Sequence, residues 1–144
     1  MLRINRQTDY AFRVILALAK HPHGTRISSS KIRDEMLIPP ALSLRIIADL
    51  AQGEFIRTFP GRDGGIELAY PAKDISLWSI LDLFEGPVHI SECQTEGVAC
   101  PFEEGCPIRR RWDPLQALLR REMEKITFEE LANDAKVFEL LAAV

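Results

Sequence analysis

The chain has 144 residues, a length that suits one domain, and it is 47% hydrophobic and 27% charged. This composition is typical of a globular protein rather than a disordered or fibrous one. The longest apolar run, residues 14–19, is far shorter than the roughly 20 residues that a membrane span requires, and no secretory leader is recognisable. We therefore expect a cytoplasmic protein without a membrane partner.

The net charge of −3 hides an asymmetry between the two halves of the chain. Residues 1–75 carry a net charge of +3, and residues 76–144 carry −6. A positive first half permits a phosphate-facing surface, and repulsion would hold the acidic half away from a nucleic acid. An ordinary solvated surface would show the same excess, so charge permits DNA binding without arguing for it.

The first predicted helix covers residues 9–20, which are apolar nearly all round and therefore expected to be mostly buried. Thr8 or Asp9 is a suitable cap for its start. Pro22 and Gly24 follow closely, and such residues end helices.

A helix-turn-helix is predicted next. A short helix is expected from the serines at 28–30 to about residue 37, because serine is a good N-cap. Pro39 and Pro40 interrupt it, and a longer helix over residues 40–52 follows, with Gly53 as its left-handed stop. A short helix, a tight turn and a longer helix form the helix-turn-helix arrangement.

Two β-capable runs, residues 55–59 and 66–70, flank a glycine-rich segment and predict a hairpin. A hairpin directly after a helix-turn-helix is a wing. The expected fold class is therefore mainly α with one β-hairpin, a winged helix-turn-helix.

The second half of the chain is expected to contain a helix over residues 76–84, a loop over about 89–107 and a long helix over 108–126. Pro114 either kinks the long helix or moves its start to Asp113. Thr127 and Glu130 form a capping box that opens a last short helix. The apolar residues of the long helix recur near every 3.5 positions: Ile108, Trp112, Leu115, Leu119 and Ile126.

In a helix-turn-helix the start of the second helix meets base edges in the major groove. Ser43 and Arg45 could form hydrogen bonds there, and Ala41 could contact a thymine methyl group. At the wing tip, Arg62 has the reach and charge to enter a minor groove. Phosphate contacts are expected from the remaining candidates: Arg3, Arg6, Ser28, Ser29, Ser30 and Lys31.

All three cysteines, Cys93, Cys100 and Cys106, lie within one loop of 14 residues. An odd count in a reducing compartment argues against a disulfide framework, and thiolates are soft ligands for zinc and for iron–sulfur clusters. The gaps are wider than those of common structural zinc sites, which favours the larger cluster. A fourth ligand would come from His89, Glu103, Glu104 or elsewhere in the chain.

The chain resembles the winged-helix regulators that include IscR, NsrR and RirA. The resemblance extends over nearly the whole length and rests on residues 8–13, 61–68, Pro71, 74–77 and 84–87, the cysteine loop with residues 106–109, and 126–127. It implies a homodimer joined through the long helix, an iron–sulfur cluster on the three cysteines, and a palindromic operator in double-stranded DNA.

The chain departs from parts of this pattern. IscR-like members have a histidine three residues after the last cysteine, where this chain has Arg109. NsrR-like members use an aspartate at the start of the first helix, supplied by the partner subunit, and Asp9 occupies that position. The first cysteine gap is one residue longer than usual, and Pro60 replaces the usual arginine before Gly61.

We therefore expect a homodimeric repressor whose cluster, [4Fe–4S] rather than [2Fe–2S], senses nitric oxide, redox state or iron and controls operator binding. Residues 1–75 would bind DNA, and residues 76–144 would hold the cluster and form the dimer. The main alternative is a winged-helix regulator with a structural zinc or a cysteine thiol switch. A thiol redox enzyme is disfavoured because a nucleophilic cysteine needs a neighbouring base or positive field and glutamates flank these cysteines, so the chain is expected not to be an enzyme.

Overall fold

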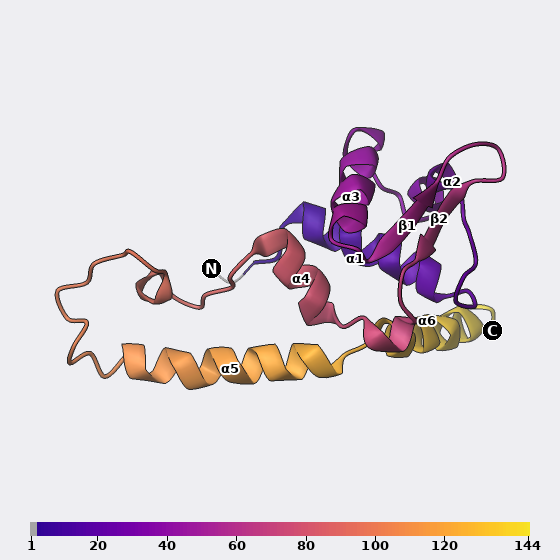
Figure 1. The fold of residues 1–144 in the computed structure, drawn as a ribbon. Coiled ribbons are helices and arrows are strands. Elements are labelled where there is room, and N and C mark those ends of the chain that lie inside the picture. The colour runs from indigo at the N-terminus through magenta and orange to yellow at the C-terminus, as the bar shows by residue number, and fades with distance from the viewer. Residues whose placement is uncertain (1–2) are drawn as a thin grey trace.

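The computed structural model describes residues 3–144 as a winged-helix body from which a loop and one long helix extend (Figure 1). The elements follow in chain order as α1 (Arg6–Ala19), α2 (Ser29–Glu35), α3 (Pro40–Gln52), β1 (Ile56–Phe59), β2 (Gly65–Leu68), α4 (Leu77–Glu85), α5 (Arg109–Lys125) and α6 (Phe128–Ala142). Short 3-10 turns occupy Ala72–Asp74 and Glu92–Gln94. The predicted fold class, mainly α with one β-hairpin, is confirmed.

Helix α1 begins three residues earlier than predicted, so neither Thr8 nor Asp9 is its cap. The Asn5 side chain accepts a hydrogen bond from the Thr8 backbone N–H at 2.9 Å and fills that role. Thr8 is instead completely buried, and its hydroxyl donates to the Glu85 carboxylate at 2.6 Å. This bond joins the start of α1 to the end of α4.

The end of α3 also differs from the prediction. Gly53 has a φ of −75°, so it is not the left-handed stop, and Glu54 takes that conformation with a φ of 65°. A β-carbon at Gly53 would lie 2.6 Å from the Leu83 side chain. A larger residue at Gly53 would therefore require the Leu83 side chain to move.

The hairpin strands β1 and β2 pair antiparallel, with Ile56 opposite Leu68 and Phe59 opposite Gly65. Ile27, just before α2, adds an antiparallel bridge to Ile66. Gly65 has a φ of 134°, and a β-carbon there would meet the Ile27 carbonyl oxygen at 2.7 Å. Only glycine allows the backbone of the wing to approach the helix-turn-helix this closely.

A single hydrophobic core joins the two halves of the chain. It contains buried residues of α1, α3 and the hairpin together with Ile80 of α4 and Phe128 of α6. Phe128 is completely buried and its ring lies 6.2 Å from that of Phe12. Helix α6 therefore packs on the DNA-binding half, although it follows α5 in the chain.

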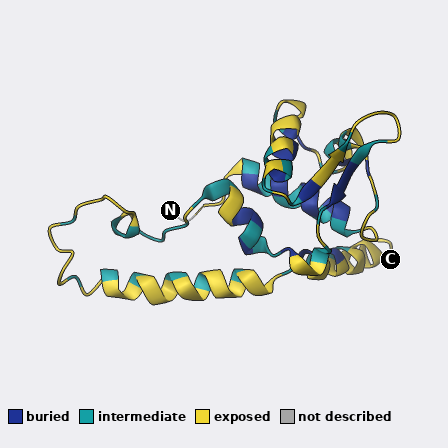
Figure 2. Ribbon diagram, viewed as in Figure 1, coloured by how far each residue is buried: buried dark blue, intermediate teal, exposed yellow. Residues whose placement is uncertain are grey.

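Helix α5 contrasts with this core because it has no buried residue (Figure 2). It begins at Arg109 and includes Pro114, which agrees with the predicted range and excludes the alternative of a start at Asp113. Its N-cap residue, Ile108, makes no side-chain capping bond, and the Arg111 N–H instead bonds to the Ile108 carbonyl. The last helix, opened by the Thr127–Glu130 capping box as predicted, has 15 residues and is not short.

Candidate DNA-binding surface and cysteine loop

The helix-turn-helix is formed by α2 and α3. Ser28 caps α2, and its hydroxyl accepts a hydrogen bond from the Lys31 backbone N–H at 3.2 Å. Ser28 and the Lys31 side chain are exposed, whereas Ser29 is partly buried in the first turn. Leu37, in the turn, has a φ of 54° and is 80% exposed.

On α3, Ala41 and Arg45 are exposed, and the Arg45 side chain is 71% exposed. Ser43 is only 5% exposed and lies on the inner face of the helix. The predicted contact of Ser43 with a base is therefore wrong, because its side chain is turned toward the core. Leu44, which sequence reasoning missed, is 74% exposed in its place.

The wing carries a network of charges that sequence reasoning missed. The Glu67 side chain, 12% exposed, lies 3.4 Å from Arg26 and 3.8 Å from Arg57. The Arg26 guanidinium also stacks over the Phe59 ring at 3.5 Å. The pairing of Arg57 with Glu67 across the hairpin was a usable signal, because opposite charges on facing strands attract. Arg62, at the tip, is exposed.

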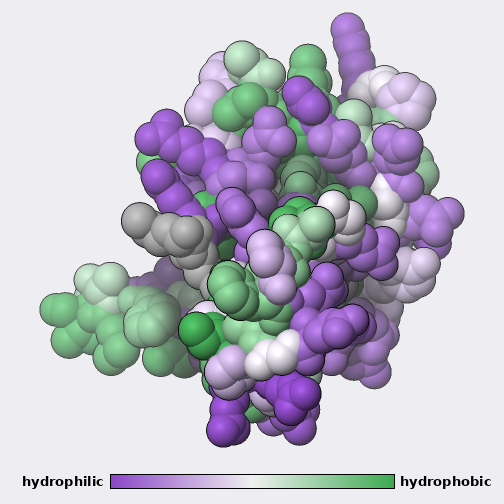
Figure 3. Space-filling model, turned by 90° about the vertical axis from the view of Figure 1, so that its left-hand side faces the viewer, coloured by the Kyte–Doolittle hydropathy of each residue, from purple (hydrophilic) through white to green (hydrophobic). Residues whose placement is uncertain are grey.

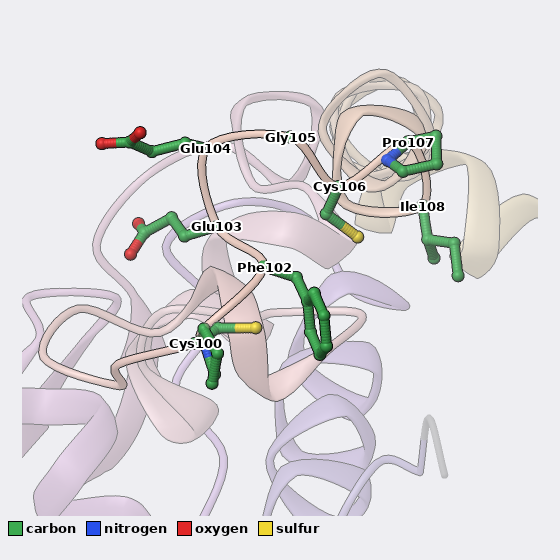
Figure 4. Close-up of a pocket in the computed structure, with 9 residues that line it drawn as sticks. Cys100, Phe102, Glu103, Glu104, Gly105, Cys106, Pro107 and Ile108 are labelled. Atoms are coloured by element: carbon green, nitrogen blue, oxygen red, sulfur yellow. The ribbon is translucent and has the colours of Figure 1, made fainter.

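The three cysteines are partly buried, and two of them share a pocket of about 800 Å³. Cys100 and Cys106 line it together with Phe102 and Ile108 (Figure 4). Figure 4 shows both thiols on the same side of the loop as the Phe102 ring, with the carboxylate of Glu104 turned away. Cys93 lies outside this pocket, with its sulfur 3.2 Å from the Ser91 hydroxyl.

The donor set has the chemistry of an iron–sulfur or zinc site, because three thiols are confined to one loop. Within residues 3–144, however, no three His, Cys, Asp or Glu side chains come together to hold one metal ion. Asp9 instead forms an ion pair with Arg13 at 2.7 Å. The single chain thus supplies the soft donors without closing a site around them.

The other predicted fourth ligands lie in different surroundings. Glu103 and Glu104 line the same pocket as Cys100 and Cys106. Glu103 forms an ion pair with Arg109 at 2.6 Å, and this contact raises the pKa of Arg109. His89 lines a separate pocket of about 410 Å³ beside Trp78. Its buried Nδ1 has no hydrogen-bond partner among residues 3–144.

Hydrogen bonds fasten the start of the cysteine loop to α5. The Gln94 side chain donates to Asp113 at 3.1 Å and accepts from the Ile90 and Ser91 backbone N–H groups. Gln116 of α5 accepts from the same Ile90 N–H at 3.2 Å. Sequence reasoning missed this connection because glutamines carry no periodic signal. The residue next to Cys93 is thus tied to the long helix.

None of the predicted dimerisation residues is buried in the single chain, and three of the five are exposed. Ile108 is 62% exposed, Leu115 48% and Ile126 37%, while Trp112 and Leu119 are partly buried. Apolar side chains are also exposed on the second half of α6, where Val137, Phe138, Leu140 and Leu141 lie. Figure 3 shows hydrophobic residues gathered on a part of the molecule that projects at the lower left.

The fold and the helix-turn-helix with its wing define a winged-helix DNA-binding regulator. Residues 4–134 match the model of the Rrf2 family, described as iron-dependent transcriptional regulators. The chain belongs to this family, which confirms the predicted resemblance. Among residues 3–144, no helix has both the length and the apolar character needed to cross a bilayer.

Similar proteins agree with this assignment. The chain is 27% identical over 136 residues to a Mycobacterium tuberculosis protein named as an HTH-type transcriptional regulator, covering 93% of this chain and 83% of the relative. It is 25% identical over 142 residues to the HTH-type transcriptional regulator NsrR of Oceanobacillus iheyensis, covering 98% and 95%. The solved structure of CymR, the global cysteine regulator of B. subtilis, has a TM-score of 0.76 at 23% identity, covering 92% and 98%.

Proposed function

We propose that this Rrf2-family regulator is a homodimeric repressor of a palindromic operator, controlled by an iron–sulfur cluster in its cysteine loop. Cys93, Cys100 and Cys106 would hold the cluster, with Asp9 of a second copy as the fourth ligand. The observation that carries the proposal is the confinement of all three thiols to the loop that joins the winged-helix body to α5. We favour [4Fe–4S] over [2Fe–2S].

The proposal that a second copy completes the site is supported by two features. The single chain assembles no three ligands within residues 3–144, and α5 has no buried residue. Asp9 lies on the first turn of α1, about half exposed. A carboxylate is a harder ligand than a thiolate, so that corner would be the reactive one. A bound cluster would supply a group that reacts with nitric oxide or oxidants.

The residues around the loop provide a route from the cysteines to the DNA-binding surface. Gln94 ties the Cys93 segment to Asp113 of α5, and Arg109 ties the Cys100–Cys106 segment through Glu103. Helix α4, just before the loop, is tied to α1 through the Glu85–Thr8 bond. A change in the loop would therefore alter the angle between α5 and the winged-helix body. In a dimer this angle sets the separation of the two α3 helices, which must match one turn of DNA, about 34–36 Å.

The test is anaerobic purification after iron-replete expression, followed by absorption spectra and counts of iron and acid-labile sulfide. We expect brown protein that contains both, and a reduced content in the single variants Cys93→Ser, Cys100→Ser, Cys106→Ser and Asp9→Ala. Nitric oxide should change the affinity of the wild-type protein for its operator. Colourless protein with stoichiometric zinc would contradict the proposal, and so would an unaltered response after all three cysteines are changed to serine.

A thiol switch is the second candidate, because Cys100 and Cys106 line one pocket without Cys93. Peroxide would take two electrons and two protons from these thiols, leaving a disulfide and two molecules of water. Mass spectrometry after peroxide treatment tests this. A Cys100–Cys106 disulfide that changes operator affinity in iron-free protein would favour the switch over the cluster.

A further inference from the structure

The exposed face of α3 is almost entirely apolar. Leu44 is 74% exposed, and Ala41 and Ala48 lie on the same face because they are three and four residues away. Ser43 is turned inward. Among the exposed residues in the first three turns of α3, only Arg45 therefore has a side-chain hydrogen-bond donor.

A large exposed apolar side chain at this place is informative. A helix-turn-helix places the first residues of its second helix on the base edges of the major groove, and in α3 these are mostly Pro, Ala and Leu. Leu37, in the turn before α3, is likewise 80% exposed. This arrangement is poorly suited to reading bases through many hydrogen bonds.

We propose that α3 selects its operator by apolar contact with thymine methyl groups, and that Leu44 is the residue that specifies thymine. In the major groove thymine alone presents a methyl group, at C5, and this group matches the apolar face of α3. The inference rests on the proposed operator binding by this helix. Arg45, 71% exposed and 3.9 Å from Asp49, is long enough to turn to a guanine, whose O6 and N7 accept two hydrogen bonds.

The charges around Leu44 favour DNA over a second protein chain as the occupant of this face. Arg45 on α3, Lys31 on α2 and Arg62 at the wing tip are all exposed. Lys31 and Arg62 lie on the elements next to α3 in the helix-turn-helix and the wing, where such cations can bind phosphates. A protein partner for an apolar patch would not require them.

The test begins with selection of double-stranded DNA from a random pool by the anaerobically purified protein. The enriched duplex is then the probe, and each thymine in a half-site is replaced in turn by deoxyuridine, which removes only the methyl group. Burying one methyl group contributes about 0.8 kcal/mol, which corresponds to an affinity change of about fourfold. We expect this loss at one or more thymines in each half-site.

Leu44→Ala should bind the thymine and deoxyuridine duplexes with equal affinity at the position that Leu44 reads. Leu140→Ala is the matched control, because Leu140 is 70% exposed on α6, on the opposite side of the body from α3 (Figure 1). The control should keep the fourfold discrimination. Equal thermal unfolding of the three proteins would show that folding is unchanged.

Three outcomes would overturn the inference. Wild-type protein that binds every deoxyuridine duplex as tightly as the thymine duplex would show that no methyl group is read. Discrimination that survives in Leu44→Ala would assign the reading to another residue. Failure of the pool to yield any enriched duplex would instead contradict the proposed operator binding, and the inference would fail with it.

Discussion

The winged-helix body and the segment made of the cysteine loop and α5 are built on different principles. The body has one core in which Ala11, Ile15, Leu50, Ile80 and Phe128 have no exposed surface. Helix α5 has 17 residues, and none of these 17 is buried. The body can thus be stable as a single chain. The second region is held by hydrogen bonds and ion pairs, and it leaves apolar side chains exposed that a second copy could cover.

The largest effect is expected from Phe128→Ala in the core. Because Phe128 is completely buried, its removal should lower the free energy of unfolding by about 3–5 kcal/mol. Phe138→Ala is the matched control on the same helix, since Phe138 is 68% exposed, and it should change stability little. Urea unfolding measures both. Equal effects of the two substitutions would show that α6 is not anchored by its first turn.

Leu115→Asp addresses the other region. Leu115 is 48% exposed in the single chain, so the substitution should leave the unfolding of one chain almost unchanged. In the proposed dimer it would place a charge in an apolar interface, and a residue at the centre of an interface contributes about 2 kcal/mol or more. Dimer affinity should therefore fall about thirtyfold, which sedimentation velocity over a concentration series would measure.

Leu44→Asp is the control for this experiment, because Leu44 is even more exposed but lies on α3. That variant should remain dimeric while it loses operator binding. A Leu115→Asp protein that stays dimeric at the lowest measurable concentration would show that α5 does not form the interface.

The two regions also differ in how far the sequence predicted them. In the body the signals are local: Ser28 and Thr127 were recognised as caps, and the structure has each of them as an N-cap. The glycine-rich turn likewise predicted the hairpin. At two positions the local predictions failed: Ser43 is buried in the core, and Glu54 rather than Gly53 takes the left-handed conformation after α3.

For the cysteine loop, the sequence predicted which residues could be metal ligands but not how they are arranged. The residues of this loop follow neither helical nor strand periodicity, so nothing in the chain predicted that Cys100 and Cys106 would share a pocket or that Gln94 would bond to Asp113. Ligands from a second copy leave no pattern in one sequence. The resemblance to known regulators supplied Asp9, which spacing alone did not indicate.

Charged contacts extend the comparison between the regions. In the wing, the Glu67 carboxylate is 12% exposed and lies close to Arg26 and Arg57. Glu67→Gln should therefore cost about 1 kcal/mol of unfolding free energy, because both cations lose a partner in a partly dry site. Glu96→Gln, at an exposed position of the cysteine loop, should cost nothing measurable, and thermal unfolding at neutral pH compares the two. Equal stability of Glu67→Gln and wild type would show that the wing does not depend on this carboxylate.

The smallest effect is expected from the exposed pair Glu122–Lys125 on α5, with 2.8 Å between its charged atoms. The hydrogen bond from Lys125 lowers the pKa of Glu122 in the folded chain. A carboxyl group with a lowered folded pKa stabilises the folded state above its unfolded pKa, about 4.3, and that contribution is lost as the pH falls through the folded value. The stability difference between wild type and Glu122→Gln should therefore be constant from pH 7 to about pH 5 and should then disappear as the pH falls through the lowered folded pKa of Glu122. High salt should remove it as well, because both side chains of the pair are more than half exposed. A difference that persists in high salt would mean that Glu122 is covered in the native assembly, so that α5 is not exposed along its whole length.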